Sequence, residues 1–232
     1  MMQYLVVRSQ RGVQDAAPSY YLRKMYIPPA NRVDDPPRIV EFIDTYGFAT
    51  VVTQREGIPW ATSLPVLLRK NEGRPTMLVS HMARANGQWQ HFASGQEILC
   101  IFNGPHAYIS PSWYAAPVAV PTWNYASVHV YGIPQIVEDK EGLLRILRDT
   151  TSKYEKHMPQ PWNMETRLPA ATADGLLKAI VGFTISISRI EAKFKLGQNR
   201  SEEDQSGMLN GLDGSGNSDA QQLAAFIRKQ KE

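Results

Sequence analysis

The chain has 232 residues, of which 43% are hydrophobic and 20% are charged. This composition is that of an ordinary globular protein and excludes a disordered chain, a coiled coil and a collagen-like repeat. The net charge of +3 is too small to indicate nucleic-acid binding by itself, and the single cysteine, Cys100, excludes an internal disulfide. No apolar run approaches the roughly 20 residues that span a bilayer. We therefore expect a cytoplasmic protein that does not enter a membrane.

The first segment, residues 1–24, is rich in basic residues and lacks the apolar core of a signal peptide. We expect it to be a disordered extension, with a transit peptide as the alternative. The folded domain is predicted over residues 25–212. Residues 213–232 are predicted to form a linker and a short C-terminal helix.

A first helix is marked at both ends. Asp34 and Asp35 are candidate N-caps, Pro36 and Pro37 suit the opening turn, and Gly47 is the expected stop. These signals predict a helix over the segment between them.

Short strands with hairpin-like connections follow this helix. β-branched and apolar residues predict strands over residues 48–54, 60–70, 76–81 and 97–102, with a short helical piece over 88–92. Pro65 places the second strand at a sheet edge or a bulge, because proline lacks a backbone N–H. Such short, closely spaced strands favour an antiparallel barrel over a parallel sheet with crossover helices.

The second half of the chain is predicted to close this barrel. Residues 104–121 are interpreted as an ordered loop, and strands are predicted over residues 124–137 and 183–194. One helix is predicted over residues 141–156, and Asp174 is expected to cap another. Ser201 with Asp204 predicts a capping box, and residues 212–222 are expected to be a flexible linker to the last helix. The predicted fold class is α+β, an antiparallel barrel with peripheral helices.

One polar cluster lies in the segment SHMARANGQWQHF. His81 and Arg84 lie on a polar turn that follows a predicted strand. Asn86, Gln88 and free backbone amides come next, at a helix start, and such groups bind a phosphate. The alternative is structural, with Arg84 paired to an acid and Asn86 capping the helix. The residues alone leave both interpretations open.

A second polar cluster, AKFKLGQNRSEED, follows the last predicted strand. Its Lys195, Gln198 and Asn199 could face an anion or a planar ring. The alternative is a solvated basic turn.

An aromatic segment lies between these clusters in the chain. Its rings could form core, an interface or a wall for a flat ligand, and they are Tyr108, Trp113, Tyr114, Trp123 and Tyr125. Cys100 is interpreted as a buried, inert thiol because it lies mid-strand between apolar neighbours. The five histidines lack the spacing of metal ligands, so no metal site is predicted.

Several motifs in the same order resemble the PaiB-type family of FMN-binding negative transcriptional regulators. They are MYIPP, HMARANGQW, IFNGPHAYISPSWY, VPTWNY and IVGF followed by AKFKLGQNRSEED, and they cover residues 25–212. The resemblance implies a split β-barrel of the pyridoxamine-phosphate-oxidase-like kind, a homodimer, and FMN at the subunit interface. The sequence departs from the family pattern at Gly87, usually proline or a similar residue, and at Gly197, usually serine.

The resemblance also implies roles for the polar residues. Arg84, with His81 and Asn86, would hold the FMN phosphate. Thr62 and Ser63 would face the isoalloxazine edge. The remaining candidates would come from the end of the closing strand across the dimer, and they are Lys195, Gln198 and Asn199.

Two functional classes stay open at this point. The first is a flavin-dependent or flavin-sensing repressor, although DNA binding rests on the family name because no helix-turn-helix is evident. The second is an FMN-dependent oxidoreductase of the same barrel class. An open cavity over the flavin face, lined by Trp113, Trp123 and His106, would favour this class. Haem in place of FMN is a third possibility.

Overall fold

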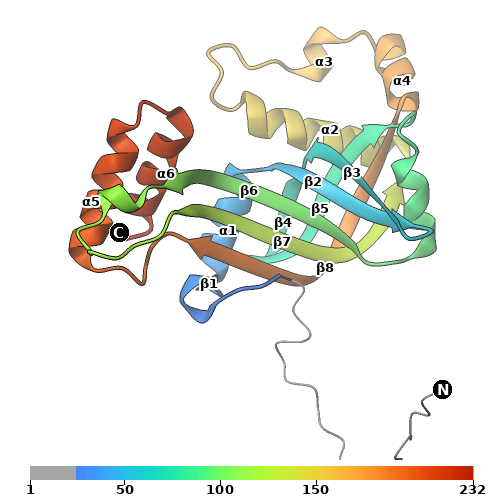
Figure 1. Ribbon diagram of the computed structural model, residues 1–232. Coiled ribbons are helices and arrows are strands. Elements are labelled where there is room, and N and C mark those ends of the chain that lie inside the picture. The colour runs from blue at the N-terminus through green and yellow to red at the C-terminus, as the bar shows by residue number, and fades with distance from the viewer. Residues whose placement is uncertain (1–24, 232) are drawn as a thin grey trace, which may run out of the picture.

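The computed structural model describes residues 25–231, so the predicted extension over residues 1–24 lies outside the described residues. Within that range eight strands form one sheet, and every pairing is antiparallel. The order is β3-β2-β6-β7-β8-β5-β4, with β1 paired to β8 (Figure 1). The strands are β1 Arg32–Val33, β2 Phe48–Arg55, β3 Ile58–Pro65, β4 Leu67–Asn71, β5 Arg74–Ala83, β6 Ile98–Ile109, β7 Thr122–Val137 and β8 Ile180–Lys195.

The sheet closes into a barrel because two consecutive strands occupy its two edges. β3 and β4 lie at opposite ends of the strand order, and Val66 alone separates them in the chain. Val66 is fully buried, and its N–H donates to the carbonyl of Gly47 at 2.8 Å. The stretch 60–70, predicted as one strand, is therefore two strands. The predicted edge position of Pro65 is confirmed, and so is the α+β antiparallel barrel.

Helices lie around the barrel and at its ends (Figure 1). α1 begins as predicted, because Asp35 accepts a hydrogen bond from the Arg38 N–H at 3.2 Å, and it buries Ile39, Phe42 and Ile43. The α-helices are α1 Pro36–Thr45, α2 Lys140–Glu155, α3 Met164–Arg167, α4 Ala170–Lys178, α5 Glu202–Gly214 and α6 Ser218–Lys229. The 3-10 helices are η2 Pro29–Asn31, η3 Gly87–Ser94 and η4 Pro111–Trp113.

Two element boundaries differ from the sequence predictions. β6 continues to Ile109, so the first part of the predicted loop 104–121 is a strand that pairs with β7 beyond a bulge. Asp174 does not cap α4. Pro169 occupies the N-cap position without a capping hydrogen bond, and Asp174 lies inside the helix and pairs with Lys140 at 2.6 Å. Alanine is the strongest helix former, so the alanines that precede Asp174 join the helix.

The C-terminal segment also differs from its prediction. α5 ends at Gly214 and α6 begins at Ser218, so residues 212–222 are mostly helical and not a flexible linker. α6 buries Leu223, Ala224 and Ile227 in the same core cluster as the barrel. Ser201 caps α5 as predicted, but the Asp204 carboxylate does not complete a capping box. It accepts hydrogen bonds from the N–H groups of residues 115 and 116 at 2.9 and 3.1 Å.

Cys100 lies in the barrel interior with no exposed surface. Burial raises the pKa of its thiol to about 12, so the thiol stays protonated and the predicted inert, buried cysteine is confirmed. Within residues 25–231, no helix is long and apolar enough to cross a membrane.

Candidate functional site

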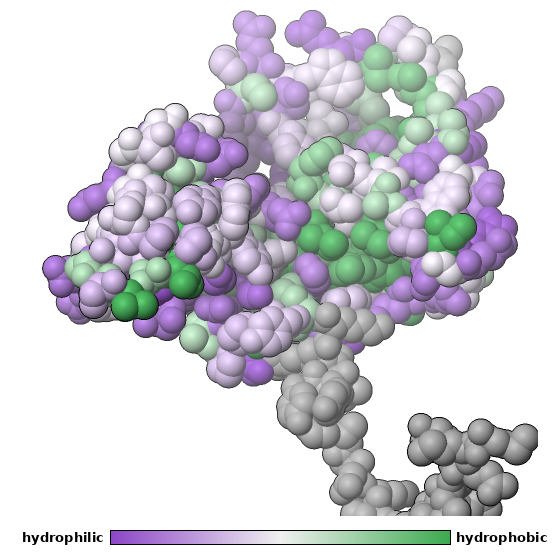
Figure 2. Space-filling model, in the orientation of Figure 1, coloured by the Kyte–Doolittle hydropathy of each residue, from purple (hydrophilic) through white to green (hydrophobic). Residues whose placement is uncertain are grey.

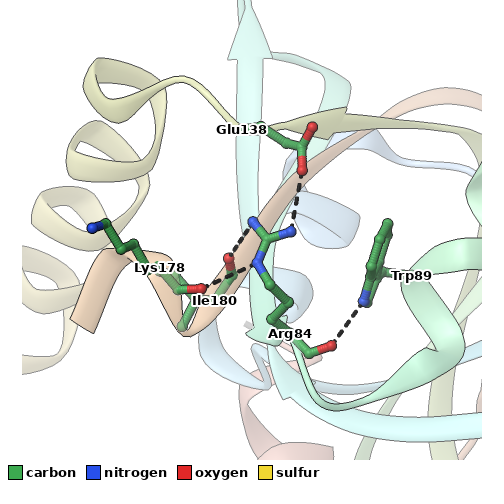
Figure 3. Close-up of polar contacts among 5 residues, drawn as sticks. All are labelled: Arg84, Trp89, Glu138, Lys178 and Ile180. Carbon is green, nitrogen blue, oxygen red and sulfur yellow. Dashed lines mark hydrogen bonds and ion pairs between the residues drawn. The ribbon is translucent and has the colours of Figure 1, made fainter. Parts of the chain in front are cut away.

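Arg84 ties three segments of the chain together just beyond β5 (Figure 3). Its Nε and Nη2 atoms donate to the carbonyls of Lys178 and Ile180, each at 3.1 Å. Its Nη1 atom donates to Glu138 Oε1 at 3.2 Å. Lys178 and Ile180 join α4 to β8, and Glu138 follows β7, so one side chain fixes the junctions around the end of β5.

The structural alternative left open by the sequence is present in these contacts. Arg84 pairs with an acid, and Asn86 caps η3 by accepting from the Gln88 N–H at 3.1 Å. Arg84 can still bind a ligand, because a guanidinium has five N–H donors and these contacts use only three of them. The Glu138 contact is solvent-exposed, and an exposed ion pair contributes only about 0–1 kcal/mol. A stronger anion could therefore replace Glu138 at low cost.

Gln88 organises a buried polar network beside Arg84. Its side chain is fully buried, and its Nε2 atom approaches Val51 O, Thr53 Oγ1 and Trp60 O at 3.0, 3.1 and 3.3 Å. Thr62 donates to its Oε1 atom, which satisfies the other end of the amide. This network fixes η3 against β2 and β3.

The two candidates on the edge strand β3 lie in different surroundings. Thr62 belongs to the polar network, because it also accepts from Asn86 Nδ2 at 3.0 Å. Ser63 is the next residue, so its side chain points to the other face of the strand, where it is exposed. Ser80 Oγ donates to the Pro65 carbonyl at 2.7 Å, which brings the end of β3 next to β5.

His81 lies on β5 opposite Gly182 of β8. Its Nδ1 atom is buried and has no hydrogen-bond partner within residues 25–231. Burial lowers the pKa of the His81 imidazole below its ordinary value, so the ring is neutral at pH 7. A neutral imidazole can offer this nitrogen either as a donor or as an acceptor.

The donor chemistry at this end of the barrel fits a phosphate-bearing cofactor. Arg84 is held rigidly and keeps two N–H donors, His81 has an unpartnered buried nitrogen, and Ser63 has an exposed hydroxyl. A fixed cation with N–H donors to spare favours a phosphate.

The second polar cluster lies at the far end of β8. Lys195 Nζ donates to Thr122 Oγ1. The Gln198 side chain bonds to the backbone of its own turn, where its Oε1 atom accepts from the Leu196 N–H at 2.7 Å. Asn199 is exposed. Gly197 has a φ of +82°, a left-handed conformation that favours glycine over the family's usual serine.

The structure does not bring the two clusters together within one chain. His81 pairs with Gly182, and Lys195 lies 13 positions further along β8 (195 minus 182). At ~3.3 Å per strand residue this separation is about 40 Å along the strand. One small molecule cannot touch both clusters of the same chain.

The aromatic segment divides between packing and surface. Trp113 packs against α5, since a Cβ added at Gly211 would lie 2.2 Å from its ring. Trp123 and Tyr108 are exposed, and the Trp123 ring lies 6.1 Å from that of His106. Trp113 therefore does not share a wall with Trp123 and His106.

Sequence reasoning missed two residues that shape this site, Trp89 and Glu138. It named Gln88 as a phosphate-binding candidate, but the structure buries that side chain completely in the polar network. Trp89 donates from Nε1 to the Arg84 carbonyl at 3.0 Å. Glu138 lies 54 positions from Arg84, a separation for which a single sequence carries no pairing signal.

Comparisons with known proteins identify the family. The family model described as "Putative FMN-binding domain" matches residues 25–189. The chain is 40% identical over 205 residues to the Bacillus subtilis (strain 168) protein named "Protease synthase and sporulation protein PAI 2", covering 88% of this chain and 96% of that one.

Two solved structures share the fold at low identity. One is an FAD and heme binding protein from Mycobacterium smegmatis, with a TM-score of 0.55 and 17% identity, covering 76% of this chain and 79% of that one. The other is the flavocytochrome Anf3 from Azotobacter vinelandii, with a TM-score of 0.54 and 17% identity, covering 75% and 73%. At this identity the likeness shows the fold alone.

The comparisons confirm the resemblance drawn from the sequence motifs, the split-barrel fold and FMN as the cofactor. Within residues 25–231 there is no cluster of three or more histidine, cysteine, aspartate or glutamate side chains that could hold a metal ion. The individual FMN contacts, the dimer and DNA binding remain predictions.

Proposed function

The chain belongs to the family described as "Putative FMN-binding domain", and on that premise we propose that it is a flavin-sensing negative regulator of transcription. The observation that carries this proposal is the 40% identity to the Bacillus subtilis protein over nearly the whole of both chains. The name of that relative includes sporulation, which is a developmental programme and not a single reaction. A regulatory role suits that name better than a metabolic reaction does.

In this proposal Arg84 holds the phosphate of FMN. It exchanges its exposed contact with Glu138 for the phosphate and keeps its hydrogen bonds to the Lys178 and Ile180 carbonyls, which aim the guanidinium. His81 offers its unpartnered Nδ1 atom, and Asn86 orients the backbone amides at the start of η3. Bound FMN would supply a redox-sensitive isoalloxazine ring.

Thr62 and Ser63 would face the edge of that ring from β3. Thr62 is held by the Asn86 and Gln88 amides, so its hydroxyl has a fixed position, whereas the exposed Ser63 hydroxyl is free to turn towards a ligand. We therefore propose that Thr62 helps to fix the position of the site and that Ser63 contacts the ring directly.

We propose that the second polar cluster completes the flavin site of a second copy. Lys195, Gln198 and Asn199 lie about 40 Å along β8 from the Arg84 end, so they can reach a flavin only across a dimer. Figure 2 shows hydrophobic residues gathered on the exposed sheet face between the two ends. An exposed apolar patch on a sheet favours burial against another subunit.

The oxidoreductase alternative has less support. It needed Trp113, Trp123 and His106 in one wall over the flavin, and Trp113 packs instead on α5. Haem would need an exposed or cavity-facing axial ligand, and the structure offers no observation that favours it over FMN. We therefore keep the proposal of a transcriptional regulator. We propose that it acts in the cytoplasm, where a lone thiol stays reduced.

Selection of duplex DNA from a random-sequence pool tests this function. Purified protein, with FMN and without it, is incubated with the pool, and bound DNA is sequenced. Enrichment of one sequence that depends on the presence of FMN is the expected result. Enrichment of none, with FMN-loaded protein that is folded and dimeric, would contradict the regulatory role.

A further inference from the structure

A cavity lies between α1 and α6, and none of the candidate flavin residues lines it. Its volume is about 290 Å³. Its aromatic walls are Phe42 of α1, Tyr46 directly after α1, Phe194 of β8 and Phe226 of α6. Phe194 points into the barrel while its neighbour Lys195 points outwards, as alternate residues of a strand do, so this cavity and the proposed flavin contacts of β8 lie on opposite faces.

The four rings form a continuous aromatic box. The Phe42 centroid lies 4.8 Å from that of Tyr46, 5.0 Å from that of Phe194 and 6.0 Å from that of Phe226. These tilted and edge-to-face contacts pack the rings against one another, and Phe42 and Phe194 are only 2% and 1% exposed, so they form the floor of the box. Phe226 and Tyr46 are only partly buried, so the box opens to solvent.

Arg38 stands at the rim of this box without an anionic partner. Its Nε and Nη2 atoms both donate to Gln230 Oε1, at 3.0 and 2.7 Å, and its guanidinium carbon lies 5.6 Å from the Phe194 centroid. Within residues 25–231, no carboxylate lies within ion-pair distance of it. Gln230 therefore fixes the orientation of a cation whose charge is not neutralised.

The other charges at the rim largely cancel. Lys229 forms an ion pair with Glu41, and both line the cavity. Burial raises the pKa of Tyr46, so its phenol stays protonated near pH 7 and can donate a hydrogen bond. The rim thus carries one net positive charge, and Arg38 supplies it.

We propose that this cavity binds a small aromatic carboxylate. The aromatic box takes the ring, and the Arg38 fork takes the carboxylate, since a planar guanidinium matches the two oxygens of that group. The volume lies at the lower end of the ~300–1,000 Å³ typical of ligand pockets, which limits the ligand to about one ring system. Because α6 supplies one wall, the ligand also holds α6 against α1.

A pair of matched ligands tests the proposal without any substitution. Phenylacetate and phenylacetamide have nearly the same shape and differ in charge, and both are titrated against the full chain by calorimetry. We expect phenylacetate to bind about tenfold tighter or more, the difference that a charge-assisted hydrogen bond makes. Equal binding of the two, or binding of neither, would overturn the proposal.

Variants then assign the selectivity to Arg38. Arg38→Gln should remove the preference for the acid, whereas Arg55→Gln, which alters an exposed arginine paired only with its neighbour Glu56 at 3.9 Å, should keep it. Phe226→Ala should weaken both ligands alike. A preference that survives Arg38→Gln in a folded protein would place the carboxylate elsewhere and contradict the assignment.

Discussion

The two ends of the barrel are held together by different chemistry. At the η3 end, a buried amide and a guanidinium join strands and helix junctions through hydrogen bonds, as Gln88 and Arg84 do. At the α5 and α6 end, rings and close backbone approaches do the same work, as Trp113 does against Gly207 and Gly211. At the polar end, a hydrogen-bond acceptor of the protein can be replaced by a ligand. At the apolar end, stability depends on how closely the side chains and backbone fit together.

The largest effect is expected at the polar end. Gln88→Leu leaves Val51 O, Thr53 Oγ1 and Trp60 O without their shared donor, and we expect the free energy of unfolding to fall by about 3 kcal/mol or more. Urea denaturation measures this fall. Gln90→Leu is the matched control, because Gln90 lies exposed on the same 3-10 helix and its replacement should change stability little. Equal losses would mean that the network does not hold this end.

A smaller loss is expected at the apolar end. A Cβ at Gly211 would meet the Trp113 ring at 2.2 Å, so Gly211→Ala should destabilise the protein by about 1–3 kcal/mol. Gly214→Ala should be neutral or stabilising, because it adds its Cβ to open space in the same helix and reduces the freedom of the unfolded chain. Thermal melts of both variants decide the matter, and a stabilising Gly211→Ala would show that α5 does not pack on Trp113 as described.

The same contrast explains what the sequence could and could not predict. Asp35, Pro36 and Gly47 mark α1 because caps and stops act locally, and Pro65 marks an edge strand through its missing N–H. Nothing local reveals that Gly207 and Gly211 make room for Trp113. The glycine-rich stretch 212–222 resembled a linker because the burial that holds α6 comes from distant residues.

The candidate site follows the same rule. The polar residues of the HMARANGQW motif were found because they are close in sequence, and the structure gathers them around the end of β5. Their partners were not found. Glu138, Lys178 and Ile180 reach Arg84 from 54, 94 and 96 positions away, and only the closed barrel brings them there.

A mixing experiment tests whether the two ends serve one site across a dimer. Arg84→Ala and Lys195→Ala should each weaken FMN binding. When the two variants are mixed and allowed to exchange subunits, half of the dimers carry one copy of each, and one of the two sites in those dimers is intact. About a quarter of all sites should then regain the affinity of the original protein. Failure to regain any, with subunit exchange demonstrated, would separate Lys195 from the flavin site.

The smallest effect concerns pH. Burial lowers the pKa values of His81 and His129 in the folded protein, although Glu191 partly opposes this for His129. The unfolded chain binds more protons than the folded one once the pH falls below the ordinary histidine value of about 6.5. Their contribution to stability is therefore present above that pH and is lost as the pH falls towards the lowered values.

Melting temperatures between pH 7.5 and 5.5 measure this contribution. The double variant His81→Gln/His129→Gln should show a shallower decline towards acid than the original protein. His157→Gln serves as the control, because His157 is exposed, and it should keep the original slope. Identical slopes for all three proteins would mean that neither buried histidine resists protonation.

The central claim is that Arg84 holds the phosphate of FMN, and titration with two flavins tests it most directly. FMN and riboflavin, which lacks the phosphate, are titrated against the original protein, Arg84→Ala, Arg84→Lys and Glu138→Gln, with a melt of each to verify the fold. Arg84→Ala should weaken FMN binding by about tenfold to a hundredfold and leave riboflavin binding nearly unchanged, because each charge-assisted bond contributes roughly 1.5–3 kcal/mol.

Arg84→Lys should bind FMN with an affinity between those of the original protein and Arg84→Ala, because lysine keeps the charge but loses the two-pronged geometry of the guanidinium. Glu138→Gln should not weaken FMN, because the phosphate displaces that carboxylate. Equal losses for FMN and riboflavin in a folded Arg84→Ala protein would contradict the account.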